Sequence, residues 1–266
     1  MTKKAVVCDL DGTLLNSAHT ISPETRDVIR QVIEKGNLFF IATGRHHLDA
    51  FAFKKMLGLH SYLISSNGAR IHDREDREIY RNDIPPALTR RLFEMPIAEG
   101  IHKSVFQGDY WYVESRLDEF AEFHKESGFE STLAEFGEIM DADTIKFLFL
   151  TETDERLVTA LDKRVREIFG GEVNAALSNE MCLEVMNKGV SKGYAVRAVM
   201  EKLGIPVSDV IAFGDGLNDK DMLMTAGKGY LMGNAHRKLK AELPDLEIVA
   251  DNDEDGVANK LRELFL

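Results

Sequence analysis

The chain has 266 residues, of which 44% are hydrophobic and 29% are charged, and it contains only 6 prolines. This composition is typical of a globular protein and excludes long disorder or a fibrous repeat. The formal net charge of −12 disfavours nucleic acid as the main partner, because an acidic surface repels a phosphate backbone. Cys8 and Cys182 are too few for a disulfide framework, and the chain shows neither a signal-peptide pattern nor a membrane-length apolar run. We therefore expect a soluble cytoplasmic protein with no membrane or nucleic-acid partner.

The first part of the chain alternates between short apolar runs and amphipathic helices. Ser22 and Pro23 predict the start of a helix, because serine caps helix N-termini and proline suits the first turn, and Gly36 predicts its end. Thr43 and the two residues after it predict the start of a second helix, where the hydroxyl and nearby amides would favour an anion. Apolar runs typical of strands buried on both faces of a parallel sheet cover residues 5–8, 38–42 and 62–66.

From about residue 84 the pattern changes to that of a mixed module of helices and strands. Residues 109–114 alternate apolar and polar side chains, as an antiparallel strand with one solvated face does. Further strands are expected over 145–150, 172–177 and 181–186, and helices over 117–126 and 155–168.

The alternation of helices and buried strands resumes near residue 188. Helices are expected over 194–203, 222–226, 236–242 and 255–264, with strands over 210–213, 230–232 and 248–250. The predicted fold class is therefore α/β, with a doubly wound, Rossmann-like parallel sheet built from residues 1–83 and 188–266. Residues 84–187 would form an inserted α+β cap domain.

Three polar segments follow predicted buried strands, at the sheet edge where open α/β proteins bind ligands. They are Asp9–Thr13, Thr43–Arg45 and Gly214–Asp219. The carboxylates of Asp9, Asp11 and Asp215 would meet there, and like charges at short range need a cation. An all-oxygen ligand set selects a hard ion such as Mg²⁺. The acids, the cation and an anion cradle at Thr43 together indicate a phosphate-transfer site.

Each of these features alone has a simpler interpretation. A pair of acids two residues apart is common and could be a solvated turn, and Thr43 with Gly44 could be a helix cap. The glycine-rich segment 214–219 could be a structural calcium loop, and Lys192 a solvated lysine at a helix start. The phosphate-transfer interpretation is favoured because all four features occur in the right order, each at the expected place in the predicted fold.

The combined motifs resemble those of the haloacid dehalogenase (HAD) superfamily, in its Cof-type branch (subfamily IIB) with a large α/β cap. The motifs that carry the resemblance are Asp9–Leu15, Ala42–Arg45, Ser66–Ala69, Gly189–Gly193 and Phe213–Asp219. Within this branch the chain is similar to bacterial sugar-phosphate and pyridoxal-phosphate phosphatases. Glu184-Val185-Met186 and the run from Thr43 to His47 incline it toward the pyridoxal-phosphate members.

The resemblance implies a role for each matching residue. Asp9 resembles the nucleophile that forms an aspartyl-phosphate, and Asp11 resembles the general acid and base. Lys192 would neutralise the nucleophile and the transferred phosphoryl group. Mg²⁺ would be ligated by Asp9, Asp215 and the backbone carbonyl of Asp11, while Asp219 would orient Lys192 or a metal-bound water. The implied phosphate-binding groups are the backbone of Leu10, the hydroxyl of Thr43, the amide of Gly44 and the side chain of Asn218.

Asp11 also discriminates between reactions within the superfamily. A dehalogenase expels halide, which needs no proton, whereas an alcohol leaving group needs one, so Asp11 favours hydrolysis of a phosphate ester. The insert follows Thr43 rather than lying between Thr13 and Thr43. This position separates the chain from the sugar phosphomutases of the superfamily, which carry a small helical cap in the earlier interval.

Four further side chains keep two interpretations each. His46 and His47 could contact substrate or be solvated near the site. Asn67 could shape a loop facing the cap or form a hairpin turn, and Glu184 could reach the substrate or be an edge-strand carboxylate.

Two other function classes stay open from the sequence. A phospho-accepting signalling module would use an aspartate, but it needs neither Asp11 nor a large cap. A metal-dependent carbohydrate-binding or glycosyl-transfer protein would explain Asp9 and Asp11, but not Lys192 or segment 214–219. The leading expectation is an Mg²⁺-dependent phosphatase for small phosphorylated metabolites, acting through an aspartyl-phosphate, with the cap selecting the substrate. The oligomeric state is left open.

Overall fold

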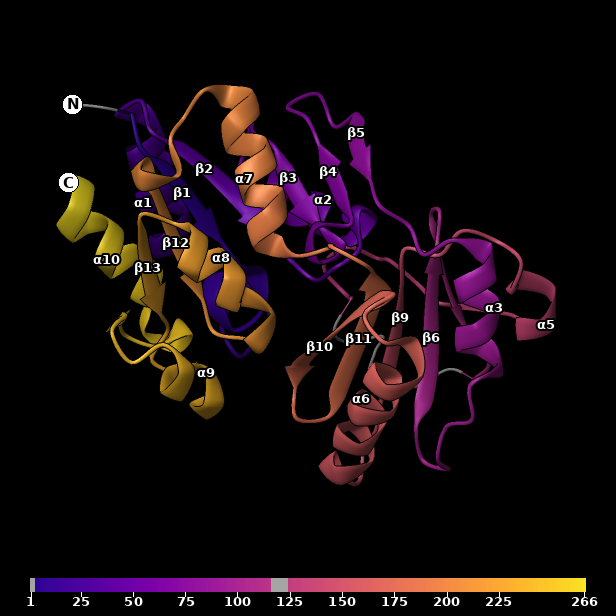
Figure 1. Ribbon diagram of the computed structural model, residues 1–266. Helices are drawn as coiled ribbons and strands as arrows, with labels where there is room; N and C mark the ends of the chain where they lie inside the picture. Colours follow the sequence, from indigo (N-terminus) through magenta and orange to yellow (C-terminus); the bar gives the residue numbers. More distant parts are fainter. Residues whose placement is uncertain (1–2, 116–123) are drawn as a thin grey trace. The chain divides into compact units, whose positions relative to one another are not determined.

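The computed structural model describes residues 3–115 and 124–266, and it divides into two compact units (Figure 1). Unit 1 combines Met1–Tyr80 with Ser191–Leu266, and unit 2 is the intervening segment Arg81–Val190. Both units contain strands and helices, so the chain is of the predicted α/β class. The expected helix over 117–126 lies largely outside the described residues. None of the described helices is long and apolar enough to cross a membrane.

Unit 1 is built on an eight-stranded sheet with the strand order β14-β13-β12-β1-β2-β3-β4-β5. The strands are β1 (Ala5–Cys8), β2 (Leu38–Ala42), β3 (Leu63–Ser65), β4 (Arg70–His72), β5 (Glu78–Arg81), β12 (Val210–Gly214), β13 (Lys228–Leu231) and β14 (Glu247–Ile248). Pairing is parallel from β14 to β3 and antiparallel between β3 and β4. The central strand β1 pairs with β2 on one side and with β12, from the far end of the chain, on the other. The sheet is therefore assembled from both ends of the sequence.

Helices cover both faces of the unit 1 sheet (Figure 1). They are α1 (Pro23–Glu34), α2 (His47–Met56), α7 (Lys192–Leu203), α8 (Lys220–Thr225), α9 (Arg237–Glu242) and α10 (Gly256–Phe265). α7 packs beside α8 on one face, and α1 packs beside α10 on the other. The apolar runs that predicted β1 and β2 are buried between these layers, with Val6, Val7 and Phe39 at most 1% exposed. This arrangement confirms the doubly wound sheet.

α1 begins where the sequence predicts, and α2 does not. Ser22 accepts a hydrogen bond from an amide of the first turn at 2.9 Å, which caps α1. α2 begins at His47, and its capping residue is His46. The segment from Thr43 forms a turn instead, in which the Thr43 hydroxyl accepts a hydrogen bond from the Arg45 amide at 3.1 Å. The prediction that Thr43 lies at a helix N-terminus is therefore wrong.

Unit 2 has a six-stranded sheet of its own, with the strand order β10-β11-β9-β6-β7-β8. The strands are β6 (His102–Gln107), β7 (Tyr110–Val113), β8 (Thr132–Leu133), β9 (Lys146–Leu150), β10 (Val173–Asn179) and β11 (Cys182–Asn187). All pairs are antiparallel except β7 with β8. The sequence pattern predicted β7, β9, β10 and β11, and it missed β6 and β8.

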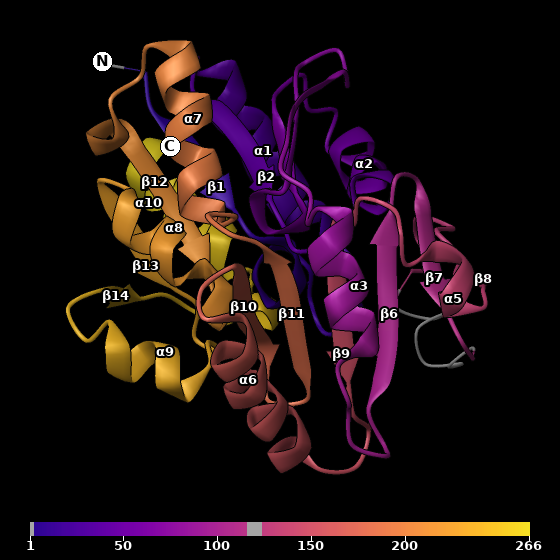
Figure 2. The ribbon, with the colours of Figure 1, turned by 45° about the vertical axis from the view of Figure 1, so that its right-hand side comes forward.

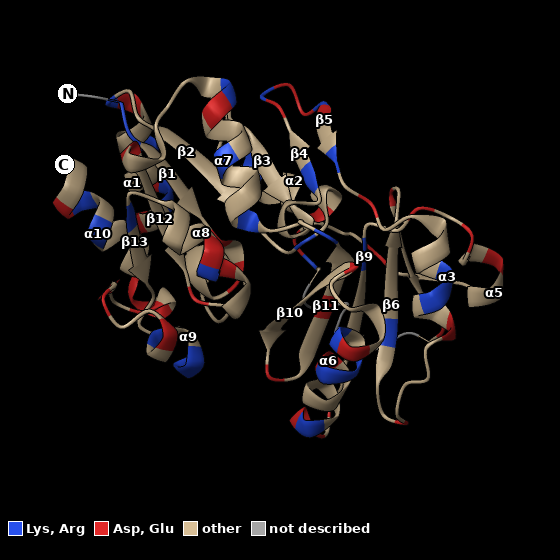
Figure 3. Ribbon diagram, in the orientation of Figure 1, with Lys and Arg blue, Asp and Glu red and all other residues tan. Residues whose placement is uncertain are grey.

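Two helices of unit 2, α3 (Pro86–Glu94) and α6 (Glu155–Phe169), pack on the same face of its sheet (Figure 2), and α5 (Phe136–Ile139) is a single turn. Leu92 of α3 and Val158 of α6 join Phe147 and Leu183 of the sheet in one buried apolar cluster. Figure 3 shows charged residues along α6, whose apolar stripe faces this cluster. Unit 2 therefore has its own hydrophobic core.

Candidate active site

The carboxyl ends of β1 and β12 bring two acidic residues together. Because the two strands pair in parallel up to their last residues, Asp9 and Asp215 leave the sheet at the same edge. The turn Leu10–Leu14 follows Asp9, and within it the Thr13 hydroxyl donates a hydrogen bond to Asp215 Oδ1 at 2.8 Å. This bond ties the loop after β1 to the loop after β12.

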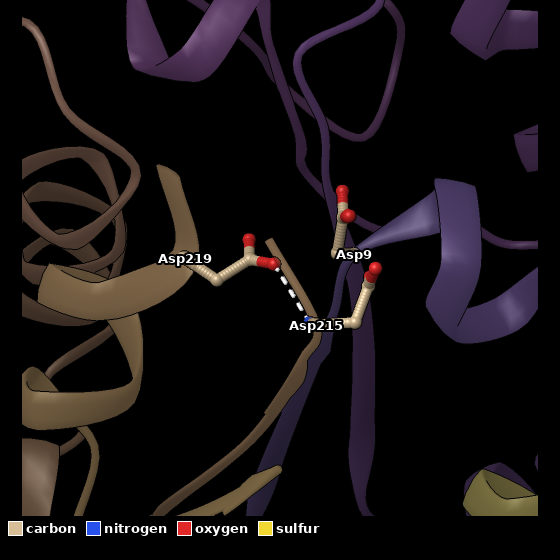
Figure 4. Close-up of side chains that lie close together, drawn as sticks. All are labelled: Asp9, Asp215 and Asp219. Carbon is tan, nitrogen blue, oxygen red and sulfur yellow. Dashed lines mark hydrogen bonds between the residues drawn. The ribbon is translucent and has the colours of Figure 1, made fainter. Parts of the chain in front are cut away.

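Three carboxylates meet at this edge, those of Asp9, Asp215 and Asp219 (Figure 4). One oxygen from each lies within 4.8 Å of the others, an arrangement that could hold a metal ion. Asp219 is fully buried, and its Oδ2 accepts hydrogen bonds from the amides of Asp215 at 3.0 Å and Gly216 at 2.9 Å. A Cβ at Gly214 would lie 2.6 Å from the Asp219 Cβ, so glycine is required there. The glycine-rich loop thus closes around a buried carboxylate.

Lys192, the first residue of α7, is fully buried against two of these carboxylates. Its Nζ lies 2.7 Å from Asp9 Oδ1 and 2.6 Å from Asp219 Oδ1. Burial by itself lowers the pKa of a lysine, but the charges of Asp219 and Asp9 outweigh it and raise the pKa of Lys192 above its ordinary value. Lys192 is therefore a charged residue of the site, and its interpretation as a solvated lysine is wrong.

The carboxylates of the cluster outnumber the lysine, and their pKa values reflect the crowding. Burial and the charge of Asp219 raise the pKa of Asp9 well above its ordinary value, and they raise the pKa of Asp215 to about 7. A divalent cation would relieve this repulsion, and carboxylate oxygens are the ligands of a hard ion such as Mg²⁺. The residues of the cluster therefore fit the predicted metal.

The Asp11 side chain is not part of this cluster. The prediction that its carboxylate meets those of Asp9 and Asp215 is therefore wrong. Its carboxylate is bound by the Arg45 guanidinium, with Nε 2.9 Å from Oδ2 and Nη2 2.6 Å from Oδ1. The physical reason is that a guanidinium pairs favourably with a carboxylate, whereas the cluster would add a further like charge. The sequence motifs placed Arg45 at this sheet edge but indicated no role for its side chain. The available signal was Asp49, an acid four residues further along the chain.

The predicted phosphate-binding residues lie around the same sheet edge, and their contacts with phosphate stay predictions. Thr43 and Gly44 follow β2, and Thr43 is fully buried; Leu10 is buried in the turn after Asp9. Asn218 donates a hydrogen bond from Nδ2 to Asn67 Oδ1 at 3.0 Å. Asn67 lies in the tight connection between antiparallel β3 and β4 with a φ of +55°, as the hairpin-turn interpretation predicts.

His46 and His47 are buried, so the interpretation that they are solvated is wrong. His46 Nδ1 accepts a hydrogen bond from the Leu48 amide at 3.3 Å and thereby caps α2. The His47 ring packs against the ring of His72 on β4, with their centroids 4.7 Å apart. Capping and packing explain why both side chains are inside unit 1, and their contact with substrate stays a prediction.

Glu184 lies in unit 2 on β11, between β10 and β9, so it is not on an edge strand as one interpretation held. Its carboxylate lies 3.4 Å from Lys146 Nζ and accepts a hydrogen bond from the Ser178 hydroxyl at 3.1 Å. Both charged residues are buried, which is tolerated because they are paired. Glu184 therefore belongs to a paired charge on the unit 2 sheet.

Acidification should destabilise the protein through His72. Burial, with the charge of His47, lowers the pKa of His72 to about 4, below the ordinary value of 6.5. As the pH falls, His72 therefore binds a proton in the unfolded chain before it does so in the folded chain. Stability that is fully present above pH 6.5 is lost as the pH falls from there through 4. The loss should reach at most about 3 kcal/mol, and His72→Phe should remove it. Urea unfolding of both proteins at neutral and acidic pH measures this; the same pH dependence in both would contradict it.

The chain matches the family model of haloacid dehalogenase-like hydrolases over residues 6–261. The chain belongs to the HAD-like hydrolases. A Haemophilus influenzae protein is 37% identical, over 98% of this chain and 97% of its own length. It is named as a phosphatase, and its name states no substrate. A Yersinia pestis protein, 35% identical over 95% of this chain and 92% of its own, is named an HMP-PP phosphatase. A HAD-like hydrolase of known structure from B. subtilis has a TM-score of 0.86 at 30% identity, over 98% of this chain and 100% of its own.

HAD membership confirms the family that the motifs predicted, and the relatives show the reaction class. Because similar HAD proteins are named phosphatases, this chain is an enzyme of that class, a phosphoric monoester hydrolase.

Proposed function

We propose that this HAD protein is an Mg²⁺-dependent phosphatase that hydrolyses small phosphorylated metabolites through an aspartyl-phosphate. The observation that carries the proposal is the placement of Asp9. Its carboxylate lies at the end of the central strand, 2.7 Å from the buried Lys192 Nζ and within the three-carboxylate cluster. A carboxylate paired with a lysine, at the edge where open α/β sheets bind ligands, is suited to attack a phosphorus atom.

The remaining chemistry is assigned to other residues of unit 1. Lys192 offsets the negative charge of the transferred phosphoryl group. Asp11 protonates the oxygen of the leaving alcohol and then accepts a proton from the water that hydrolyses the aspartyl-phosphate. The phosphoryl oxygens are held by Leu10, Thr43, Gly44 and Asn218.

Mg²⁺ would be held by Asp9, Asp215 and the carbonyl of Asp11. Asp219 would orient Lys192 through its Oδ1. Its Oδ2 accepts hydrogen bonds from two amides of the loop. When bound, the ion supplies positive charge to the nucleophile and to the phosphate oxygens.

Gly12→Ala should weaken the response to Mg²⁺. Gly12 has a φ of +71°, and a Cβ there would lie 2.3 Å from Asp215 Oδ2, so the alanine would displace that carboxylate. The left-handed backbone should cost about 1–2 kcal/mol of stability. Gly36→Ala is the matched control, because Gly36 also has a positive φ, +89°, but open space around it. Urea unfolding should show this backbone cost in both variants, while only Gly12→Ala raises the Mg²⁺ concentration needed for half activity. Equal Mg²⁺ responses would contradict the role of Asp215.

The proposed substrate is a phosphomonoester of a small ring compound, such as a sugar phosphate or pyridoxal phosphate. The support is the resemblance of the motifs to phosphatases of such compounds and the similarity to a protein named an HMP-PP phosphatase.

The proposed place of action is the cytoplasm. Cys8 and Cys182 are both free and buried, which accords with a reducing compartment.

Hydrolysis of p-nitrophenyl phosphate in the presence of Mg²⁺ tests the proposed function. Release of nitrophenol over many turnovers supports a phosphatase. A single stoichiometric release with a long-lived aspartyl-phosphate would indicate a phospho-accepting signalling module instead. Metal-dependent sugar binding without hydrolysis of any phosphate ester would indicate the carbohydrate-binding class.

We also propose that unit 2 selects the substrate. All the residues assigned to phosphoryl transfer lie in unit 1, so unit 2 is free to serve another purpose. Binding energy from the non-phosphate part of a substrate can discriminate between leaving groups that share one phosphate. Glu184 and Lys146 form a charged pair on the sheet of unit 2, and we propose these two side chains for such recognition.

Replacing Glu184 should change the substrate ranking without changing the metal requirement. For Glu184→Ala we expect relative kcat/KM values in a panel of phosphorylated metabolites to change by about tenfold for the most affected member. Glu184→Gln keeps the side-chain volume and serves as a second variant, because the alanine removes the whole carboxylate group that lies beside Lys146. Glu167→Ala, on the exposed side of α6, is the matched control and should leave the ranking alone. A ranking that stays the same in both Glu184 variants would contradict this role.

A further inference from the structure

Arg45 joins two carboxylates that lie on different elements of unit 1. Its Nε and Nη2 donate to the two oxygens of Asp11 at 2.9 and 2.6 Å. Its Nη1 lies 3.3 and 3.1 Å from the two oxygens of Asp49, in the first turn of α2. The Arg45 side chain is only 3% exposed and that of Asp49 is fully buried. The guanidinium therefore has a partner on each side.

The rest of Arg45 is held as firmly as its guanidinium. The carbon at the centre of the guanidinium lies 5.1 Å from the centroid of the Phe53 ring, a cation–π distance. Its backbone amide donates to the Thr43 hydroxyl at 3.1 Å, and its carbonyl accepts from the Ser66 amide at 2.8 Å. Arg45 is therefore a rigid support at the sheet edge.

Asp11 is less enclosed than its partner. Its side chain is 33% exposed, and it lies in a turn whose next residue, Gly12, has a positive φ. An exposed aspartate can adopt several side-chain rotamers, whereas two parallel N–H···O bonds select one of them. Each carboxylate oxygen has two lone pairs, so the two donors leave one on each oxygen for a transferred proton.

We propose that Arg45, anchored by Asp49, is a positioning residue that sets the orientation of the Asp11 carboxyl for proton transfer. This inference rests on the proposed function, in which Asp11 is the general acid and base. Asp11 gives its proton to the leaving oxygen as the phosphorus–oxygen bond breaks, and it regains one from the water that attacks the aspartyl-phosphate. Arg45 gains and loses no proton in either step.

The test is the dependence of kcat/KM on the leaving group, measured with aryl and alkyl phosphates whose alcohols differ in pKa. Alkoxide leaves poorly without a proton, whereas nitrophenolate leaves readily. Arg45→Gln should therefore lower kcat/KM for alkyl phosphates by about 10- to 100-fold, within the contribution of general acid catalysis. For p-nitrophenyl phosphate the loss should stay below about threefold, because that leaving group needs no acid.

Asp11→Asn and the double variant decide how Arg45 acts. If Arg45 works through Asp11, then Arg45→Gln in the Asp11→Asn background causes no further loss of kcat/KM. Equal losses for all leaving groups, or losses that add to those of Asp11→Asn, would show a merely structural role and overturn the inference. If Asp11→Asn itself shows no leaving-group dependence, the general-acid role in the proposed function fails, and the inference fails with it.

Asp49→Asn keeps the inference testable where Arg45→Gln does not fold. The asparagine still accepts a hydrogen bond from Arg45 but loses the charge that anchors the guanidinium. A smaller loss with the same preference for alkyl phosphates supports the positioning role. A loss of the same size for every leaving group, with an unchanged thermal midpoint, would overturn it.

Discussion

Replacing Asp9 by Asn should reduce phosphate release to below about one per cent of the wild-type rate, because it removes a covalent nucleophile. The fold should survive, since asparagine has nearly the same shape. Asparagine also keeps a side-chain oxygen that can accept the hydrogen bond from Lys192 Nζ, which Asp9 Oδ1 accepts at 2.7 Å, so the free energy of unfolding should change little. Turnover of p-nitrophenyl phosphate and urea unfolding, measured on the same preparation, test the two halves of this prediction.

Asp209→Asn is the matched control for Asp9. Asp209 immediately precedes β12, and its Oδ1 lies 2.6 Å from Nζ of Lys4, which immediately precedes β1. This ion pair therefore lies at the amino ends of the two strands, whereas the cluster lies at their carboxyl ends. Its replacement should leave turnover nearly unchanged. Activity of Asp9→Asn above one per cent of wild type, together with a normal unfolding curve, would refute Asp9 as the nucleophile.

Removal of divalent cations should abolish activity, and Mg²⁺ should restore it. The reason is the crowding of Asp9, Asp215 and Asp219, which a cation relieves. Ca²⁺ should restore activity poorly, because it prefers longer bonds and more ligands than the small octahedral ion. Phosphate release after chelation, with each ion added back in turn, measures this. Full turnover in excess chelator would exclude the metal-dependent mechanism.

The same cluster should bind Mg²⁺ in the absence of substrate. A ligand that binds only the folded state stabilises it by about 2.7 kcal/mol at a hundred times its dissociation constant. Mg²⁺ should therefore raise the thermal midpoint of the wild-type protein, and Asp215→Asn should remove most of that rise. A rise of equal size in both proteins would place the ion elsewhere. This readout is independent of catalysis, so it separates a lost metal site from a lost reaction step.

Local sequence was sufficient for several elements of unit 1, such as β1, β2 and α1. A strand buried on both faces is apolar at consecutive positions, and the runs at 5–8 and 38–42 have this property, so β1 and β2 appear with the predicted bounds. α1 was predictable because Ser22 and Pro23 act within its first turn. β6 of unit 2 was missed because its polar residues, such as His102, Lys103 and Gln107, weaken the apolar pattern of a strand whose stability comes from its neighbours.

The sequence by itself determined which segments reach the site, and the tertiary structure decided which of their charges meet. Motif order and strand pattern were enough to place Asp9 and Asp215 at one sheet edge, because parallel strands end on the same side. They could not show that Asp219 completes the cluster while Asp11 turns to Arg45. Those pairings join residues that are far apart in the chain or on different turns. Each depends on burial, which disfavours a charge, and on a nearby opposite charge, which favours it. Both conditions exist only once the layers of the fold have packed.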